Sequence, residues 1–390
     1  MKSVNYLVGS PDTINTPLVP FSPLIKEFVA AFSAKLLKSP KAKQFPDIVA
    51  LGFWCRKSNI EKLQARQSLG NDRVGRGLVF HVAPSNVPVN FAFSYFFALL
   101  AGNANIVRVP SKEFPQVEII CDVLKSVLSD YPEIDKRTAF VKYPVSDEIT
   151  GEFCRLADAR IIWGGDETVR QLRTYEVKPR CVDVVFADRY SLAVVDAATV
   201  EAASEAEMKK LCDGFYNDTY LMDQNACSSA QLILWQNAAE GAKDKFWEAV
   251  ARSAGKYNLQ AAVAVDKYCK MCEDAIDLEC VASVKRYGGN LVYVAELNKL
   301  PEDTSVLRGK GGYFYQFDID GFSDIDRIVN ERYQTVSCFG VSAEELREHV
   351  ISSGLRGIDR IVPFGSAMDI SVIWDGFDII GTLSRIVALS

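Results

Sequence analysis

Apolar positions in the first half of the chain follow two different periods. Phe28, Phe32 and Leu36 recur at helical spacing, and Ile48, Leu51 and Trp54 mark a second apolar face, which predicts helices within residues 22–67. Short strand-like runs then alternate with helical segments, at residues 77–82, 105–109, 138–142, 160–163 and 183–186. Apolar strands that alternate with helices are typical of a parallel sheet covered by helices. The pattern therefore predicts an α/β fold.

The first βαβ unit is the most clearly marked. Residues 77–82 lead into a turn rich in Pro and Asn at 83–88, an apolar segment follows at 91–101, and Gly102 ends it before the next strand. Pro88 lies near the first turn of the expected helix, where a missing N–H leaves no hydrogen bond unmade. Sheets of this kind bind ligands at the carboxyl ends of their strands.

Chain length and helix caps suggest where the molecule divides. At 390 residues the chain exceeds the size at which one hydrophobic core keeps growing, so two domains are expected. Ser204 and Glu207 form a capping box ahead of an apolar helical pattern, and Ser342 and Glu345 repeat the device before Gly354. We expect domains at 1–200 and 201–365, and a segment at 366–390 that returns to the first domain or reaches a neighbouring subunit.

Charge and cysteine content exclude several function classes. The net charge of −6 comes without a basic stripe, which excludes nucleic acid as a partner. The first residues lack the apolar core of a signal peptide and the run at 91–101 is too short to span a bilayer, so a soluble cytoplasmic protein is expected. Cys269, Cys272 and Cys280 lack a fourth zinc ligand nearby, because His81 and His349 are distant in sequence. We expect no metal site, and two cysteines on a helix face.

One cysteine stands apart from the other nine. Cys227 lies in the polar, small-residue stretch Asp-Gln-Asn-Ala-Cys-Ser-Ser at 223–229, directly before the apolar run 230–235. The small neighbours leave room for a substrate and can donate hydrogen bonds to a thiolate. Cys227 is therefore the candidate nucleophile; an inert loop cysteine is the alternative.

The turn at 84–88, Pro-Ser-Asn-Val-Pro, together with the Gly102-Asn103 pair and a strand that ends in Arg108, resembles the cofactor domain of the aldehyde dehydrogenase superfamily. The resemblance implies that the Asn86 carboxamide contributes to the oxyanion hole. It also implies that Arg108 is a cation near the ribose of the cofactor.

Further blocks at 163–168, 188–193, 223–229, 357–365 and 374–376 make the chain similar to the LuxC family of acyl-CoA reductases within that superfamily, from about Leu24 to Arg385. The resemblance implies an aldehyde dehydrogenase-like fold, with a Rossmann-like cofactor domain at 1–200 and a catalytic domain at 201–365. It also implies a homo-oligomer, partly built from strands such as those at 366–390. The implied substrate is a fatty acyl thioester, delivered by coenzyme A, an acyl carrier protein or an acyl-protein synthetase.

The cofactor residues depart from the ordinary dinucleotide fingerprint. A Gly-x-Gly-x-x-Gly motif is absent, so the candidate backbone contact is the turn with Gly164 and Gly165 ahead of a helix; a simple strand-to-helix turn would use the same glycines. By the resemblance, NAD-specific relatives carry a glutamate where this chain has Ser111. Uncharged Ser111 beside Arg108 and Lys112 leaves room and charge for a 2′-phosphate, which predicts NADPH.

A residue expected of aldehyde-oxidising relatives is missing. Their hydrolytic glutamate aligns with Phe186, so an acyl group on Cys227 would persist until a thiol or a hydride reaches it. Asp188 is an alternative base. The resemblance therefore implies reduction of activated fatty acyl groups to aldehydes with NADPH through an acyl-cysteine. The alternatives are a conventional aldehyde-oxidising dehydrogenase and a non-catalytic assembly partner on the same fold.

Overall fold

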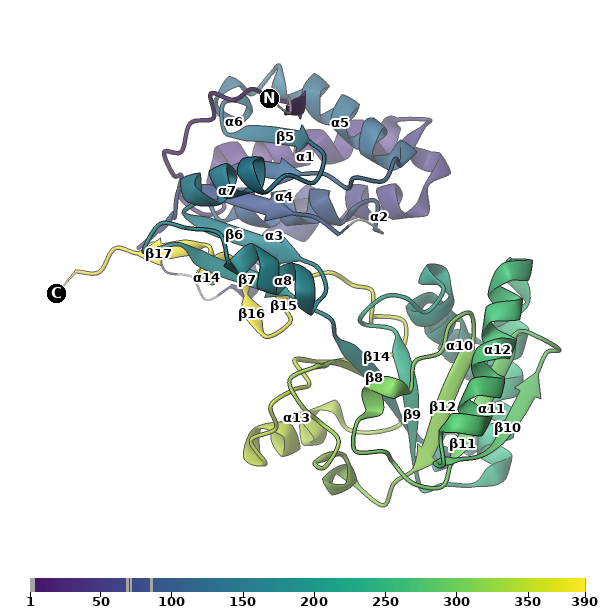
Figure 1. The fold of residues 1–390 in the computed structure, drawn as a ribbon. Helices are drawn as coiled ribbons and strands as arrows, with labels where there is room; N and C mark the ends of the chain where they lie inside the picture. The colour runs from purple at the N-terminus through teal and green to yellow at the C-terminus, as the bar shows by residue number, and fades with distance from the viewer. Residues whose placement is uncertain (1–3, 68–69, 71, 85–86, 390) are drawn as a thin grey trace. The chain divides into compact units, whose positions relative to one another are not determined.

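The chain forms two compact units in the computed structural model, which describes residues 4–67, 70, 72–84 and 87–389. Unit 1 comprises Met1–Ala187 and Ser371–Ser390, and unit 2 comprises Asp188–Ile370 (Figure 1). This division lies earlier than the predicted 200/201 boundary. The reason is that β8 (Tyr190–Asp196) pairs with β9 (Ala230–Gln236) on one side and β13 (Tyr333–Phe339) on the other, both in the sheet of unit 2.

Unit 1 is built on a six-stranded sheet with the order β1-β5-β4-β3-β6-β7. The five predicted strands are confirmed to within one residue at each end, and all five run parallel; the short β1 pairs antiparallel with β5 at one edge. The strands are β1 (Asn5–Val8), β3 (Leu78–Val82), β4 (Ala104–Arg108), β5 (Thr138–Lys142), β6 (Ala159–Trp163) and β7 (Val182–Phe186).

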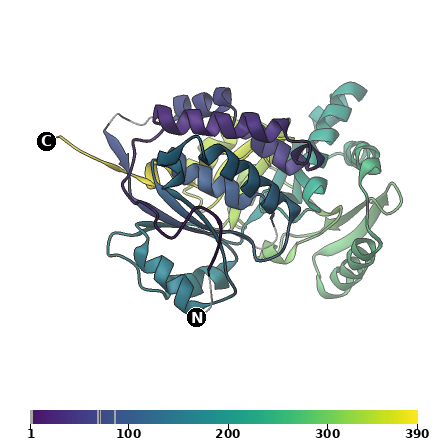
Figure 2. The same ribbon diagram turned by 90° about the horizontal axis from the view of Figure 1, so that it is seen from above.

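The helices of unit 1 cover this sheet. Proline at the first turn begins α1, α2, α5 and α6, where a missing N–H is tolerated. Seen from above, the purple helix α1 runs beside the helices it packs on (Figure 2). The helices are α1 (Pro23–Lys38), α2 (Pro46–Trp54), α3 (Lys57–Arg66), α4 (Asn90–Leu100), α5 (Pro115–Leu128), α6 (Pro132–Asp135), α7 (Asp147–Leu156), α8 (Asp166–Arg173) and α14 (Ile379–Thr382).

Helix α4 is the predicted apolar helix, and it is buried along its whole length from Phe91 to Leu100. It packs against β3 and β4 and is covered by α1 and α14. A helix that is apolar all round requires such cover on every side. The C-terminal segment supplies part of it, because α14 follows the hairpin of β15 (Ile373–Trp374) and β16 (Phe377–Asp378).

Near the C-terminus, the chain then pairs with the short strand that precedes β3. β17 (Ser384–Ile386) lies antiparallel to β2 (Arg73–Gly75). Buried Asn103 reinforces this return: its Nδ2 donates to the carbonyl oxygen of Leu383 over 2.9 Å, and its Oδ1 accepts the backbone N–H groups of Arg76 and Gly77.

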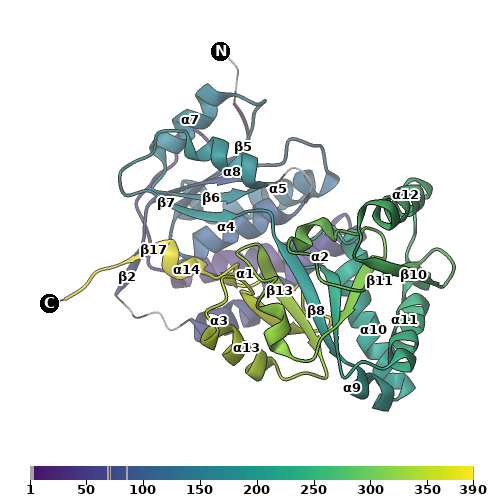
Figure 3. The same cartoon turned by 60° about the horizontal axis from the view of Figure 1, so that its bottom comes forward.

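Unit 2 is built on a seven-stranded sheet with the order β10-β11-β12-β9-β8-β13-β14. Its strands are parallel except for the antiparallel edge pair β10 and β11, and β8 lies beside β13 near one end (Figure 3). The remaining strands are β10 (Val281–Tyr287), β11 (Val292–Leu297), β12 (Tyr313–Asp318) and β14 (Arg360–Pro363). The helices are α9 (Ala197–Ala202), α10 (Glu205–Thr219), α11 (Glu240–Ser253), α12 (Ala261–Asp277) and α13 (Ala343–Ser352).

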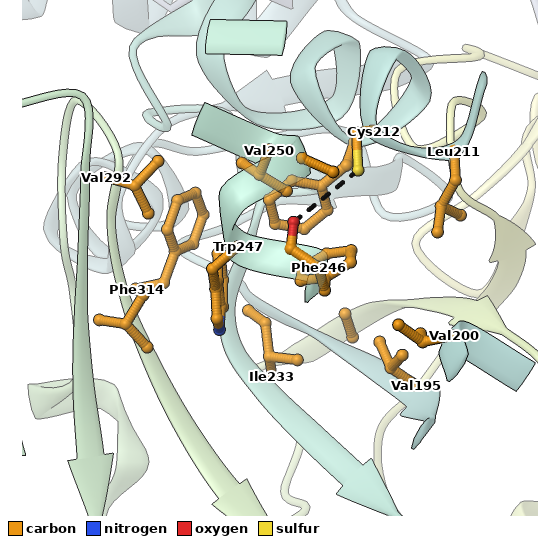
Figure 4. Close-up of a cluster of buried hydrophobic side chains, with 14 of the residues drawn as sticks. Val195, Val200, Leu211, Cys212, Ile233, Phe246, Trp247, Val250, Val292 and Phe314 are labelled. Atoms are coloured by element: carbon orange, nitrogen blue, oxygen red, sulfur yellow. Dashed lines mark hydrogen bonds between the residues drawn. The ribbon is translucent and has the colours of Figure 1, made fainter. Parts of the chain in front are cut away.

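Aromatic rings attach α10 and α11 to this sheet. Figure 4 shows Trp247 facing Phe314, with ring centroids 5.2 Å apart, and the Cys212 thiol directed at the carbonyl of Phe246. The predicted capping box of Ser204 and Glu207 begins α10. The helix that leads to the candidate nucleophile is therefore capped at its start and packed on a rigid core.

Candidate active site

Cys227 lies in a tight loop between α10 and β9, which we call the nucleophile loop (residues 223–229). The loop begins with two consecutive non-glycine residues in left-handed backbone conformation, Asp223 (φ 51°) and Gln224 (φ 63°). Such a pair is costly and persists only where neighbouring groups hold it. Cys227 is half-buried, and its carbonyl oxygen accepts the hydroxyl of Ser191 at the start of β8 over 2.6 Å. The cysteine thus lies at the amino end of β9, and not at a carboxyl strand end.

Two glutamines hold the loop through hydrogen bonds to backbone groups. Buried Gln224 donates through Nε2 to the carbonyl of Tyr313 over 2.9 Å and accepts the N–H of Gly312 through Oε1 over 3.2 Å. Gln231 donates to the backbone carbonyl of Gln224 over 3.0 Å and accepts the N–H of Gly309 over 2.9 Å. Residues 309–312, which we call the glycine segment, are therefore bonded to both ends of the turn that carries the cysteine.

Asp218 holds the other flank. Its carboxylate accepts the N–H groups of Gly365 and Ala367 at 2.7 and 2.9 Å, and its carbonyl accepts the hydroxyl of Ser229 over 2.7 Å. Burial raises the pKa of Asp218 to about 6, although the two backbone N–H groups act in the opposite direction. The segment at 365–367 is thereby fixed beside the nucleophile loop.

Burial disfavours the thiolate at most of the other cysteines. Desolvation raises the pKa of seven thiols. The pKa rises to about 12 at Cys121, Cys212 and Cys338 and to about 11 at Cys181, and it is also raised at Cys55, Cys154 and Cys280. Cys269 and Cys272 lie on α12, which confirms the predicted helix. Among the residues described, no group of three or more His, Cys, Asp and Glu side chains could hold a metal ion.

The position of the missing glutamate is occupied by an aromatic ring. Phe186 ends β7, is buried, and stacks on Trp163 with centroids 3.8 Å apart. Asp188, the alternative base, forms a two-pronged ion pair with Arg308 at 3.1 and 3.0 Å. Both carboxylate oxygens of Asp188 thus accept hydrogen bonds from Arg308, and this geometry disfavours Asp188 as a base.

The predicted cofactor residues of unit 1 gather at one edge of its sheet, which we call the cofactor edge. Arg108 ends β4, and its guanidinium lies over the ring of Tyr143, 4.5 Å from the centroid. Ser111 and Lys112 follow in an exposed loop, where Lys112 lies 5.3 Å from the Phe114 centroid. None of these three side chains pairs with a carboxylate in the part of the chain that the structure describes, which leaves two cations for an anionic ligand.

Gly164 and Gly165 lie at the same edge, at the carboxyl end of β6 two strands away. A Cβ at Gly165 would meet no atom within 4 Å, so a ligand has room to approach the backbone there. However, the first turn of α8 carries Asp166 and Glu167, and these carboxylates oppose a phosphate at the helix start. This turn fits an uncharged part of a cofactor better than its phosphates.

A directed chain of hydrogen bonds supports the cofactor edge from inside. Trp163 donates to the Ser94 hydroxyl over 3.1 Å, and that hydroxyl lies 2.8 Å from Nδ1 of His81. The amide nitrogen of Asn105 donates to the carbonyl of Asn103, so its oxygen faces Nε2 of His81 at 3.0 Å and Nε2 carries the proton. Burial lowers the pKa of His81 to about 3, against the effect of the Asn105 bond, and the imidazole is neutral.

Asn86, the predicted oxyanion donor, lies outside the described residues. The elements that flank it are described. β3, which lies between β4 and β6 in the sheet, ends at Val82, and α4 begins at Asn90. Sequence reasoning missed the roles of Gln224, Gln231 and Asp218. The seven-residue spacing of the two glutamines around Cys227 was visible, but only the reversal of the loop brings them together.

No helix in the described part of the chain is long and apolar enough to cross a membrane. Solved structures of aldehyde dehydrogenases match the fold. KauB from Pseudomonas aeruginosa gives a TM-score of 0.61 at 13% identity, over 94% of this chain and 83% of that one. A 1-pyrroline-5-carboxylate dehydrogenase from Thermus thermophilus gives 0.58 at 13%, over 93% and 81%. The predicted aldehyde dehydrogenase-like fold is confirmed.

Sequence comparison is more specific. The long-chain acyl-protein thioester reductase of Vibrio harveyi is 22% identical over 303 residues, which is 74% of this chain and 59% of that protein. The chain thus spans less than two thirds of the length of this curated relative. The family described as acyl-CoA reductase (LuxC) matches residues 55–266, more than half of the 390 residues. The chain therefore belongs to the LuxC acyl-CoA reductase family.

Proposed function

We propose that the protein reduces activated fatty acyl groups to aldehydes, with Cys227 as the nucleophile and NADPH as the reductant. The observation that carries the proposal is the nucleophile loop: a half-buried thiol on a strained turn, held by Gln224, Gln231 and Ser191. A covalent step requires the attacking atom to be placed within a fraction of an ångström, and strain held by such contacts is common at active sites.

The acylation step balances without a further reagent. The Cys227 thiolate attacks the carbonyl carbon of a fatty acyl thioester, the bond to the donor sulfur breaks, and the donor leaves as a thiolate that takes a proton from solvent. The Asn86 carboxamide and the backbone N–H of Cys227 are the donors we assign to the oxyanion. Donors of this class are acyl-coenzyme A, an acyl carrier protein and an acyl group supplied by an acyl-protein synthetase.

The reduction step uses the cofactor edge. Bound NADPH would supply a hydride to the acyl-cysteine, after which the thiohemiacetal releases the aldehyde and the thiolate. Arg108 and Lys112 supply positive charge, Ser111 leaves space for a 2′-phosphate, and Gly165, which follows Gly164, offers open backbone. Phe186 and the Arg308-paired Asp188 provide no free base to activate water, so the acyl-cysteine persists until it is reduced.

The test is to trap the intermediate. Protein mixed with a long-chain acyl-coenzyme A in the absence of NADPH should gain the mass of one acyl group per chain, mapped to the peptide that contains Cys227. Adding NADPH should discharge the adduct as aldehyde, with loss of absorbance at 340 nm. Cys227→Ala should form no adduct, and Cys269→Ala, which changes an exposed thiol on α12, should behave like the parent.

Other outcomes separate the alternatives. Rapid release of free fatty acid instead of a stable adduct would indicate a hydrolytic aldehyde dehydrogenase. An adduct from an acylated partner protein, but not from acyl-coenzyme A, would change the donor and keep the cysteine chemistry. Failure of every thioester to acylate Cys227 would refute the proposal and leave an assembly role on this fold.

A further inference from the structure

Lys267 is a buried lysine whose ammonium touches only backbone oxygen and an aromatic ring. It lies on α12 with 2% of its surface exposed, whereas much of the same helix faces solvent. Its Nζ donates to the carbonyl of Asn290 and, over 2.9 Å, to that of Gly311, and it lies 4.8 Å from the centroid of the Tyr293 ring. No carboxylate pairs with it among the residues described, since Asp274 on the same helix is held by Lys270 and Tyr315.

One of the two carbonyls belongs to the glycine segment, which is bonded to the nucleophile loop. Gly311 lies in that segment, whereas Asn290 lies in the turn between β10 and β11. The N–H of Gly311 donates to the carbonyl of Asp223, the first residue of the loop, over 3.3 Å, and the next N–H, that of Gly312, donates to Oε1 of Gln224. The Gly311 carbonyl and the Gly312 N–H belong to the same peptide unit, so this unit links the Lys267 ammonium to the Gln224 side chain.

The glycine segment has little freedom to move away from these bonds. A Cβ at Gly312 would lie 2.3 Å from the carbonyl oxygen of Leu291 and 2.6 Å from the hydroxyl of Tyr220, so this backbone is packed directly against its neighbours. Gly311 and Gly312 both have positive φ, at 58° and 89°. The Lys267 ammonium adds a hydrogen bond to the carbonyl of the Gly311–Gly312 peptide and so helps to fix its orientation.

We propose that Lys267 is a positioning residue for the nucleophile: its buried ammonium orients the Gly311–Gly312 peptide, whose N–H holds the Gln224 side chain, and with it the loop that carries Cys227. The inference rests on the proposed function for its catalytic consequence. Its structural part, the anchoring of the loop, stands on the contacts alone. A neutral donor would satisfy the same carbonyls at lower desolvation cost, so stability alone does not account for a charged group there.

Burial lowers the pKa of Lys267 to about 8. The ammonium is therefore lost as pH rises through about 8, and hydrogen bonds from the neutral amine are weaker than those from the charged form. Titratable and charged groups surround it on each neighbouring element: Asp266, Lys270 and Asp274 on α12, Arg286 on β10, Tyr293 on β11, Tyr313 and Tyr315 on β12, and Tyr220, Asp223 and Tyr257 beside the glycine segment. The loop should loosen over this alkaline range.

The experiment compares Lys267→Met, which keeps the unbranched apolar stem, with Lys299→Met, which removes an exposed lysine elsewhere in unit 2. Three quantities are measured from pH 6.5 to 9.5: hydrogen exchange of the peptide spanning 220–231, corrected for intrinsic rates; alkylation of Cys227 by iodoacetamide; and its acylation by acyl-coenzyme A. In the parent, loop exchange should rise with a midpoint near pH 8. In Lys267→Met it should be high at every pH.

Acylation by Lys267→Met should fall roughly 10- to 100-fold, since small displacements of a nucleophile have effects of this size. Lys299→Met should match the parent in all three measurements. Equal loop exchange in Lys267→Met and the parent would overturn the proposal, and so would a rise in exchange spread evenly over unit 2, which indicates a purely structural lysine. If the parent forms no acyl adduct, the proposed function fails, and loop exchange and alkylation still decide the role of Lys267.

Discussion

The nucleophile loop of unit 2 and the cofactor edge of unit 1 both lie at the ends of strands, but their supporting hydrogen bonds differ. In unit 2, Gln231 donates to the backbone of the loop itself, and the side chain of Gln224, a loop residue, bonds to the backbone of Tyr313 and Gly312. In unit 1, the chain from Trp163 through Ser94 to His81 lies inside the domain, beneath the strand ends, and Ser111 and Lys112 remain exposed. The difference indicates that hydrogen bonds hold the proposed nucleophile directly, whereas the proposed cofactor surface has buried polar support and leaves its side chains free.

The largest expected effect is at the nucleophile. Cys227→Ala should abolish acylation and reduction, and Cys227→Ser should be nearly inactive because a serine hydroxyl is a much weaker nucleophile than a thiolate. The fold should persist, since the side chain is half-buried and the loop is held through other residues. Intact-protein mass and aldehyde release measure this. Turnover by the alanine variant at the parent rate would refute the assignment of Cys227 as the nucleophile.

Asn86→Ala should lower kcat by roughly 10²–10³, with little change in cofactor affinity, if its carboxamide stabilises the oxyanion. A residue that only caps the start of α4 would instead cost about 1 kcal/mol of stability and leave the rate unchanged. Kinetics and thermal melts on one preparation separate these results.

Gln224→Ala should cost about 1–3 kcal/mol of stability, because the N–H of Gly312 and the carbonyl of Tyr313 lose a buried partner. The displaced loop should also lower the acylation rate, on the order of 10²-fold. Gln260→Ala, an exposed glutamine before α12, serves as the control and should stay within about 0.5 kcal/mol of the parent. A stability loss without a rate loss would mean that the hydrogen bonds of Gln224 do not position the cysteine.

Acid should affect His81 of unit 1 and Asp218 of unit 2 in opposite directions. The pKa of His81 is lowered from 6.5 to about 3 by burial, so below pH 6.5 the unfolded chain binds a proton that the folded chain does not. This histidine should therefore cost unit 1 about 1.4 kcal/mol per pH unit as pH falls below 6.5. The pKa of Asp218 is raised from 3.8 to about 6, so this carboxyl adds stability as pH falls from 6 towards 3.8, whereas carboxylates of unit 2 with lowered pKa values, such as Asp196 and Asp244, act in the opposite direction.

Hydrogen exchange of peptides from each unit, corrected for intrinsic rates, measures this contrast. His81→Gln should remove the acid dependence of unit 1, and His349→Gln, at the only other histidine, should retain it. An unchanged acid dependence of unit 1 in His81→Gln would contradict the assignment of a neutral His81.

The smallest expected effect is at the exposed cofactor edge. Ser111→Glu should reduce the preference for NADPH over NADH roughly tenfold, since a carboxylate there repels a 2′-phosphate and accepts ribose hydroxyls. Ser129→Glu, an exposed serine after α5, is the matched control. Equal kcat/KM for both cofactors in the parent would count against the assignment of Ser111.

Much of the fold follows from local patterns. Apolar runs predicted all five parallel strands of unit 1, and the continuous apolar character of 91–101 predicted a buried helix. The capping box at Ser204 was legible because both partners lie within one turn. These features depend on neighbours in sequence, and local spacing reports them directly. The small polar neighbours of Cys227 likewise marked it without any tertiary information.

The tertiary structure alone decided which distant groups meet. The run that became β8 reads as a strand, but its place in unit 2 depends on pairing with β9 and β13. Lys267 reads as an exposed residue of a polar helix, and its burial appears only when α12 covers the glycine segment. Gln224 and Asp218 act on backbone groups far along the chain. Every residue carries the same backbone N–H and C=O groups, so the sequence holds no signal of which side chain will bond to them.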